Sequence, residues 1–73
     1  MGKRKVRLTN CIRELRAGAD GMTQQQLADL VGVTRQTINA IEANKYSPSL
    51  EVAFLIARAL DAQLEELFGI VDS

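Results

Sequence analysis

Three side chains close together in the chain, Arg35, Gln36 and Asn39, carry paired hydrogen-bonding groups. A guanidinium donates two parallel hydrogen bonds, and the amide of glutamine or asparagine offers a donor beside an acceptor. Such pairs match base edges in the major groove, because arginine can donate to guanine O6 and N7 and an amide can pair with adenine N6 and N7. The chemistry is recognition by hydrogen bonding, and it needs one element that presents all three side chains together.

Residue types for other chemistry are scarce. The chain has 73 residues with no histidine and a single cysteine, Cys11, so it offers neither an internal disulfide nor the usual transition-metal ligands. It also contains no glycine-rich phosphate loop and no paired-carboxylate pocket that its length could enclose. We therefore expect a protein that is not an enzyme, that needs no metal or cofactor and binds no small-molecule ligand, and in which Cys11 serves packing.

Length and composition describe one small globular domain, since 47% of the residues are hydrophobic and 25% are charged. No apolar run approaches the roughly 20 residues that span a bilayer, and the first seven residues lack the apolar stretch of a signal peptide. We expect a cytoplasmic protein without membrane insertion. A domain this short buries only roughly 60% of the surface of its unfolded chain, so a dimer interface would stabilise it.

Charge is distributed unevenly along the chain. Residues 1–45 contain eight basic and four acidic residues, whereas residues 46–73 contain one basic and five acidic residues, so a net +4 is balanced by a net −4. The N-terminal part could therefore face an anion such as DNA phosphate, while the C-terminal part faces elsewhere. The alternative is that both sets of charges lie on ordinary solvated faces.

Hydrophobic spacing predicts an all-α fold, with a basic arm over residues 1–7, a helical domain over 8–68, and a short tail over 69–73. Within the arm, Lys3, Arg4, Lys5 and Arg7 form either a solvated terminus or an extension that follows the DNA backbone or minor groove. The five expected helices cover residues 8–17, the segment between Thr23 and Gly32, and residues 34–43, 50–60 and 63–68.

The boundaries of the second and third helices are marked by specific residues. Thr23 with Gln26 forms a capping-box pattern, Gly32 permits the left-handed backbone that ends a helix, and Thr34 is a second N-cap candidate. In the helix over 34–43, Ile38 and Ile41 form the inward pair. Arg35, Gln36 and Asn39 therefore lie on its outer faces, where they can read bases. The alternative is that they are only the solvated face of a structural helix.

Residues 23–42, TQQQLADLVGVTRQTINAIE, resemble a helix-turn-helix. The wider stretch, from IRELR at 12–16 through SPSLEVAFLIARAL at 47–60, resembles the phage-repressor-like family, also called Xre or Cro/repressor-type. The resemblance implies a compact five-helix domain of the lambda-repressor-like type that binds double-stranded DNA. By the same resemblance, Arg35, Gln36 and Asn39 contact bases and Gln24 also braces Gln36, while the DNA backbone or supporting positions are Gln24, Thr34, Thr37, Lys45 and Arg16.

An acidic residue at the end of a helix that faces DNA must be paired, because a free carboxylate would repel phosphate. The resemblance implies that a basic residue of the first helix pairs with Glu42. Arg16 is the expected partner. Arg13 is the alternative, because this chain has one more residue between Arg16 and Gln24 than the family pattern has. The pair would orient the arginine toward phosphate.

The acidic C-terminal part of the chain, residues 46–73, contains more apolar residues than its own core needs. A homodimer surface is the expectation, since symmetric operators repeat a half-site about every 34 Å; the alternative is that these residues only close the core. The candidate surface comprises Leu55, Leu64, Phe68, Ile70 and Val71. The sequence thus predicts a transcriptional regulator, a repressor that reads the major groove with the helix over 34–43 as a homodimer. The alternative is an antitoxin-like DNA-binding protein whose C-terminal half binds a partner protein.

Overall fold

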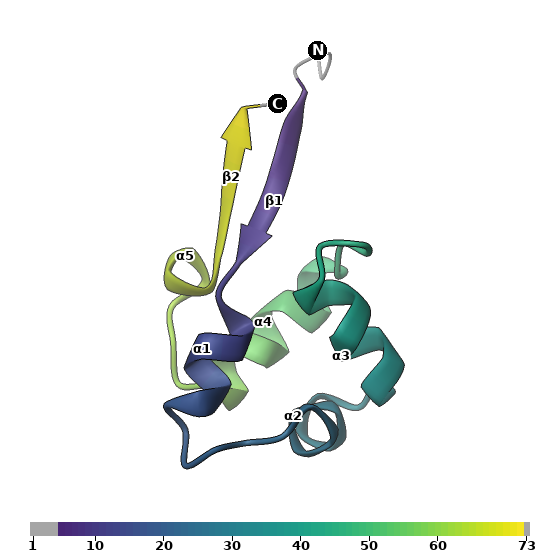
Figure 1. Cartoon of the computed structure of the whole chain (residues 1–73), viewed down its shortest axis with the longest axis vertical. Helices are drawn as coiled ribbons and strands as arrows, with labels where there is room; N and C mark the ends of the chain where they lie inside the picture. The colour runs from purple at the N-terminus through teal and green to yellow at the C-terminus, as the bar shows by residue number, and fades with distance from the viewer. Residues whose placement is uncertain (1–4, 73) are drawn as a thin grey trace.

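The computed structural model describes residues 5–72, which form a helical body and a two-stranded ribbon that projects from it (Figure 1). The molecule measures 39 × 21 × 19 Å, and the ribbon lies along its longest dimension. The elements in chain order are β1 (Val6–Asn10), α1 (Ile12–Ala17), α2 (Gln24–Val31), α3 (Arg35–Glu42), α4 (Leu50–Ala59), α5 (Leu64–Leu67) and β2 (Phe68–Asp72).

The core lies between the helices, and every helix contributes to it. Six large side chains are almost completely removed from solvent, and burial of each stabilises the fold by about 1.5–3 kcal/mol. These are Ile12 of α1, Leu27 of α2, Ile38 and Ile41 of α3, Ile56 of α4 and Leu67 of α5. Ala28 is buried beside Leu27, and its small side chain lets α2 approach its neighbours closely.

Four of the five predicted helices are present with bounds that differ by no more than about a residue from those expected. At the start of α4, the backbone amide of Val52 donates to Ser49 Oγ at 3.2 Å. Before α5, Gln63 and Glu66 form a capping box in which the Gln63 amide donates to Glu66 Oε1 at 2.6 Å. These local hydrogen bonds fix where each helix begins.

The prediction of an all-α fold is wrong in one respect, because the two ends of the described chain form an antiparallel pair of strands. Leu8 pairs with Ile70 and Asn10 with Phe68. The helix expected from residue 8 therefore begins at Ile12, where the Ile12 amide donates to Asn10 Oδ1 at 3.1 Å. Periodicity could not reveal the ribbon, because each strand finds its hydrogen-bonding partner about sixty residues away in the chain.

The ribbon also changes the description of the segments expected to form an arm and a tail. Arg7 and Val71 are paired residues of the two strands, and Lys5 lies exposed directly before β1. Lys3, Arg4 and Ser73 lie outside the described residues.

Candidate nucleic-acid interface

The turn between α2 and α3 is built from local backbone chemistry. The Gln26 amide donates to Thr23 Oγ1 at 3.0 Å and the Thr23 amide donates to Gln26 Oε1 at 2.8 Å, which completes the expected capping box at the start of α2. Gly32 ends α2 with φ of 88°, a left-handed conformation that L side chains rarely adopt. Thr34 then caps α3 by accepting from the Thr37 amide at 3.1 Å. The two helices are thereby held as a helix–turn–helix pair (Figure 1).

One side of α3 faces the core and the other faces solvent. Ile38 and Ile41 are buried, whereas Arg35, Gln36 and Asn39 are all exposed. Arg35 and Asn39 are four residues apart, so they lie one above the other on the helix surface with Gln36 beside them. The three hydrogen-bonding side chains are thus available together to a ligand on the outer side of α3.

A nearly buried ion pair joins α1 to the end of α3. Arg16 Nε donates to Glu42 Oε2 at 2.6 Å, and Arg16 Nη2 donates to Glu42 Oε1 at 3.0 Å. The side chain of Arg16 is 13% exposed and that of Glu42 is 6% exposed. A further bond, from Arg16 Nη1 to the carbonyl oxygen of Met22 at 2.8 Å, fixes the loop before α2. Arg16, the expected partner of the two arginines considered, is therefore the residue that contacts Glu42.

The environment keeps this pair ionised. Burial acts to raise the pKa of the Glu42 carboxyl, because it penalises the charged form. Hydrogen bonds from Arg16 and Gln24, together with the charges of Arg16 and Arg13, outweigh burial and hold the pKa of Glu42 below its ordinary value. The hydrogen bond to Glu42 in turn raises the pKa of Arg16. Arg13 therefore contributes its charge without replacing Arg16 as the partner.

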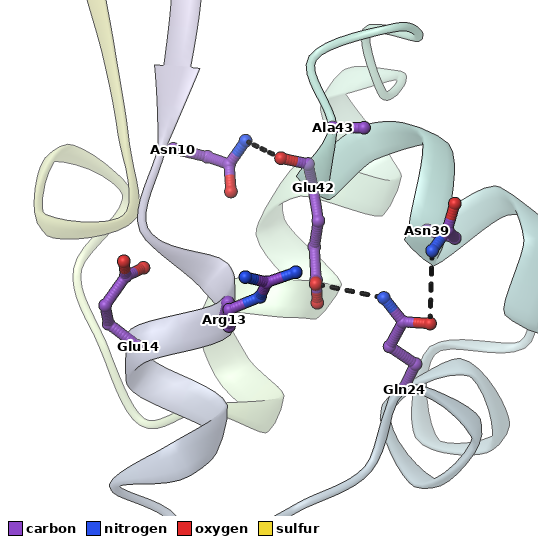
Figure 2. Close-up of a pocket in the computed structure, with 7 residues that line it drawn as sticks. All are labelled: Asn10, Arg13, Glu14, Gln24, Asn39, Glu42 and Ala43. Carbon is purple, nitrogen blue, oxygen red and sulfur yellow. Dashed lines mark hydrogen bonds between the residues drawn. The ribbon is translucent and has the colours of Figure 1, made fainter.

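Gln24 links this ion pair to the exposed side of α3. Its Nε2 donates to Glu42 Oε1 at 3.1 Å, and its Oε1 accepts a long hydrogen bond of 3.5 Å from Asn39 Nδ2 (Figure 2). The sequence suggested that Gln24 braces Gln36, but within residues 5–72 the side chains bonded to Gln24 are those of Glu42 and Asn39. The orientation of Asn39 is thereby coupled to the buried pair.

The other predicted supporting residues surround the two ends of α3. Thr34 is exposed at its start, where its hydroxyl lies 3.0 Å from that of Thr37. Lys45 is exposed in the loop after α3, and its amide donates to the Ala40 carbonyl at 2.9 Å. A hydroxyl pair and a lysine therefore lie at opposite ends of the helix that carries Arg35, Gln36 and Asn39.

Asn10, which the sequence did not single out, ties the ribbon to the end of α3. Its Nδ2 donates to the Ile41 carbonyl at 3.0 Å and to Asn44 Oδ1 at 2.9 Å. Asn44 has φ of 61°, in the left-handed region that asparagine tolerates better than most residues. The local signal was present, since an asparagine side chain often accepts from the amide two residues on, as it does here from Ile12, but its long-range partners are set by the fold.

The five residues expected at a dimer surface do not share one face. Leu64, Phe68 and Ile70 line a common groove. Val71 points to the opposite face of the ribbon from Ile70, because successive side chains of a strand alternate. Leu55 is 38% exposed on α4 but lines neither of the apolar grooves beside the ribbon.

Residues 5–72 hold no group of three or more Cys, Asp or Glu side chains arranged to bind a metal ion. None of the helices among them has the length and apolar character needed to cross a membrane. A polar cleft of about 240 Å³ lies between α1 and α3, and Asn10, Arg13, Gln24, Asn39 and Glu42 are among the residues that line it (Figure 2).

A capped helix, a sharp glycine turn and a second helix that presents hydrogen-bonding side chains to solvent define the class of helix-turn-helix DNA-binding domains. Comparison with known families agrees with the geometry. A helix-turn-helix family model matches residues 12–67, and the chain belongs to this family, the Xre or lambda-repressor-like group. The protein is a DNA-binding transcriptional regulator of the helix-turn-helix type.

Individual relatives support the same assignment. The chain is 54% identical over 57 residues to an uncharacterized HTH-type transcriptional regulator of Archaeoglobus fulgidus, covering 78% of this chain and 80% of the relative. Among solved structures, it is similar to the restriction-modification controller protein C.AhdI from Aeromonas hydrophila, with 36% identity, a TM-score of 0.67, and coverage of 75% and 78%. It is also similar to a putative DNA-binding protein from Bacteroides fragilis, with 27% identity, a TM-score of 0.75, and coverage of 85% and 98%.

Proposed function

We propose that the protein is a sequence-specific repressor that binds its operator as a homodimer, with α3 in the major groove. The observation that carries this proposal is the outward side of α3, where Arg35, Gln36 and Asn39 are exposed together. A groove roughly 12 Å wide accepts one helix, whose N-terminal residues then meet the base edges. Arg35 is the guanine reader, and the amides of Gln36 and Asn39 are the adenine readers.

The hydrogen-bond network behind α3 supports the role of Asn39. Its amide group is held by Gln24, which is held in turn by the Glu42–Arg16 pair. A side chain that is oriented before binding loses less conformational entropy in the complex. Asn39 is therefore expected to discriminate between bases more strongly than an equally exposed but unsupported amide.

Contacts to the phosphate backbone fix the position of such a helix without reading sequence. We assign this role to Thr34 and Lys45, which are exposed at the two ends of α3. Thr37 supports Thr34 through the hydroxyl contact and can offer its methyl group to a thymine. Gln24 and Arg16 serve mainly as supports for α3, because both are engaged with Glu42.

Dimerisation and repression complete the proposal. A domain of 73 residues that makes contacts in one groove binds weakly alone, and a two-fold dimer contacts two half-sites about 34 Å apart. A dimer on its operator occupies DNA that polymerase needs, so we infer that binding represses. A promoter fusion that carries the operator should show lower expression when the protein is present, and higher expression would indicate an activator.

The test of base reading is selection of bound duplexes from a random DNA pool, followed by titration of the selected site at several salt concentrations. The expected result is an inverted repeat with half-sites about one helical turn apart and an affinity that falls steeply with salt. Arg35→Ala should cost about 1–3 kcal/mol on the selected site and little on random DNA.

Lys45→Ala provides the matched control, because a phosphate contact contributes to every sequence equally. This variant should weaken binding to selected and random DNA alike and reduce the salt slope by about one. If Arg35→Ala behaves in the same way as Lys45→Ala, then Arg35 contacts phosphate. If no sequence is enriched, α3 is not a base reader in this chain.

A further inference from the structure

An apolar groove runs along one side of the ribbon, on the part of the molecule away from the outward side of α3. Two adjoining depressions, of about 330 and 310 Å³, share Leu8, Leu64 and Phe68 as lining residues, so they form one continuous surface. Leu50 at the start of α4 lines only the first depression, and Ile70 of β2 lines only the second. We call this surface, formed by Leu8, Leu50, Leu64, Phe68 and Ile70, the apolar groove.

Strand register explains why these side chains gather on one face. Leu8 pairs with Ile70, and Phe68 lies two residues before Ile70, so alternation directs all three to the same side of the ribbon. Val6, the first residue of β1 and two residues before Leu8, extends this face toward the free end of the ribbon and is 43% exposed. The two ends of the groove are the most open, since Ile70 is 65% exposed and Leu50 is 67% exposed. Phe54, one helical turn after Leu50, is 54% exposed.

The ribbon itself lacks the support that such a structure needs. A two-stranded pair is marginally stable in water, and independent stability requires further strands or packing against a helix. Figure 1 shows that the outer half of the ribbon extends beyond all the helices. The helices meet its apolar face only at the base of the ribbon, where Leu64 of α5 lies beside Phe68. The rest of this face, which includes Val6 and Ile70, is open to solvent.

The shape of the surface fits a second copy of this chain. A two-fold interface requires one patch that is complementary to itself. Here Ile70 projects beside the depression formed by Leu8 and Leu64, so each of two opposed copies offers both the projecting side chain and the depression that receives it.

Charge favours the same occupant in one orientation. The groove is bordered by Glu65 at the base of the ribbon, and Lys5 lies exposed at the free end of β1. If two ribbons cross antiparallel, the free end of each approaches the base of the other, which brings Lys5 of one copy toward Glu65 of the second copy. The opposite orientation would place the two Glu65 carboxylates close together, and like charges disfavour it.

We propose that two copies associate through the apolar groove across a two-fold axis, with the Ile70 side chain of each copy seated against Leu8 and Leu64 of the other. This proposal rests on the homodimer of the proposed function and specifies its interface. The groove begins at Pro48 and Leu50, in the segment that follows α3, so the interface lies beside the C-terminal end of the proposed reading helix. None of the residues that line the groove belongs to α3.

The test is the mass of the full chain in solution, measured by sedimentation equilibrium at micromolar concentration. The wild type should give twice the chain mass of 8.0 kDa. Ile70→Asp should raise the dissociation constant of the dimer about 100-fold or more, because a two-fold interface loses two buried isoleucines at once. Leu50→Asp, on α4, should act in the same direction and does not depend on the ribbon.

Val71→Asp is the matched control, since it places the same charge at the adjacent position of the same strand but on the opposite face. It should leave the dimer intact, and far-UV circular dichroism should show that every variant is folded. A monomeric wild type would overturn the proposal, as would dissociation by Val71→Asp with Ile70→Asp still dimeric. If Ile70→Asp were unfolded, Leu50→Asp would decide.

Binding to DNA separates this proposal from the proposed function. A folded Ile70→Asp monomer should still bind a single selected half-site, and adding Arg35→Ala should weaken that binding by the same factor as in the wild type. The Ile70→Asp monomer should lose the extra affinity that the wild-type dimer gains from two linked half-sites. A wild-type dimer that dissociates with Ile70→Asp but selects no DNA sequence would support this interface and contradict base reading by α3.

Discussion

Removal of the charge on Glu42 should destabilise the protein more than any exposed acidic substitution. Glu42→Gln keeps the length of the side chain and one oxygen acceptor, but it leaves the Arg16 guanidinium without its counter-ion. The side chain of Arg16 is only 13% exposed, so water cannot fully replace the lost carboxylate. The same change weakens the bond from Gln24 that orients Asn39.

The size of the effect follows from the burial of the pair. Breaking a buried ion pair by removal of one partner costs about 3–5 kcal/mol. We expect the lower end, about 3 kcal/mol, because Arg16 retains its bond to the Met22 carbonyl and some contact with water. For a domain of this size, each kcal/mol lowers Tm by about 4–8 °C, so Glu42→Gln should lower Tm by about 12 °C or more.

The pH dependence of this stabilisation has a definite sign. The pKa of Glu42 is lower in the folded protein than its ordinary value, whereas in the unfolded chain it lies near 4.3. The contribution of the charged carboxylate is therefore fully present above about pH 4.3 and is lost as the pH falls through the lower folded pKa. Because the glutamine introduced by Glu42→Gln does not titrate, the difference between wild type and variant should shrink over that acidic window.

Urea denaturation followed by circular dichroism measures both the loss of stability in Glu42→Gln and its dependence on pH. All samples should have the same protein concentration, because association adds to the apparent stability. The exposed Glu14→Gln is the control and should change the free energy of unfolding by less than about 0.5 kcal/mol. A loss below about 1 kcal/mol for Glu42→Gln would mean that the pair contributes no more than a surface salt bridge. A difference that stays constant from about pH 7 to pH 3 would refute the assigned pKa direction.

Two further substitutions test the supports of the helix–turn–helix. Gly32→Ala should lower the free energy of unfolding by about 1–2 kcal/mol from backbone strain alone, because φ is 88° and no atom lies within 4 Å of the added Cβ. Gly18→Ala, at φ of −75°, is the control and should not destabilise the protein. Asn10→Ala should cost about 1–3 kcal/mol, because it removes the hydrogen bonds to the Ile41 carbonyl and to Asn44 Oδ1 and takes the side-chain acceptor away from the Ile12 amide. Urea denaturation reports both, and no loss for Gly32→Ala or Asn10→Ala would show that the corresponding support is dispensable.

The sequence by itself determined the helices after the first one and the turn of the helix–turn–helix. Thr23, Gly32, Thr34 and Ser49 act on amides or dihedral angles within a few residues of themselves, so their effect is visible from the local sequence. The inward positions of Ile38 and Ile41 follow from helical periodicity and leave the hydrogen-bonding side chains outside. Family resemblance added the expected partner of Glu42, which local spacing left open between Arg13 and Arg16.

Only the tertiary structure decided which distant groups meet. The ribbon exists because β1 and β2 satisfy each other's backbone hydrogen bonds from opposite ends of the chain, and no local period records that pairing. The same register separates Ile70 from Val71 and gathers Leu8, Leu64 and Phe68 into the apolar groove. The contacts of Asn10 with the end of α3 and of Gln24 with Asn39 likewise join residues 15 or more positions apart. Such contacts depend on how the helices pack around the core, and packing is a property of the whole chain.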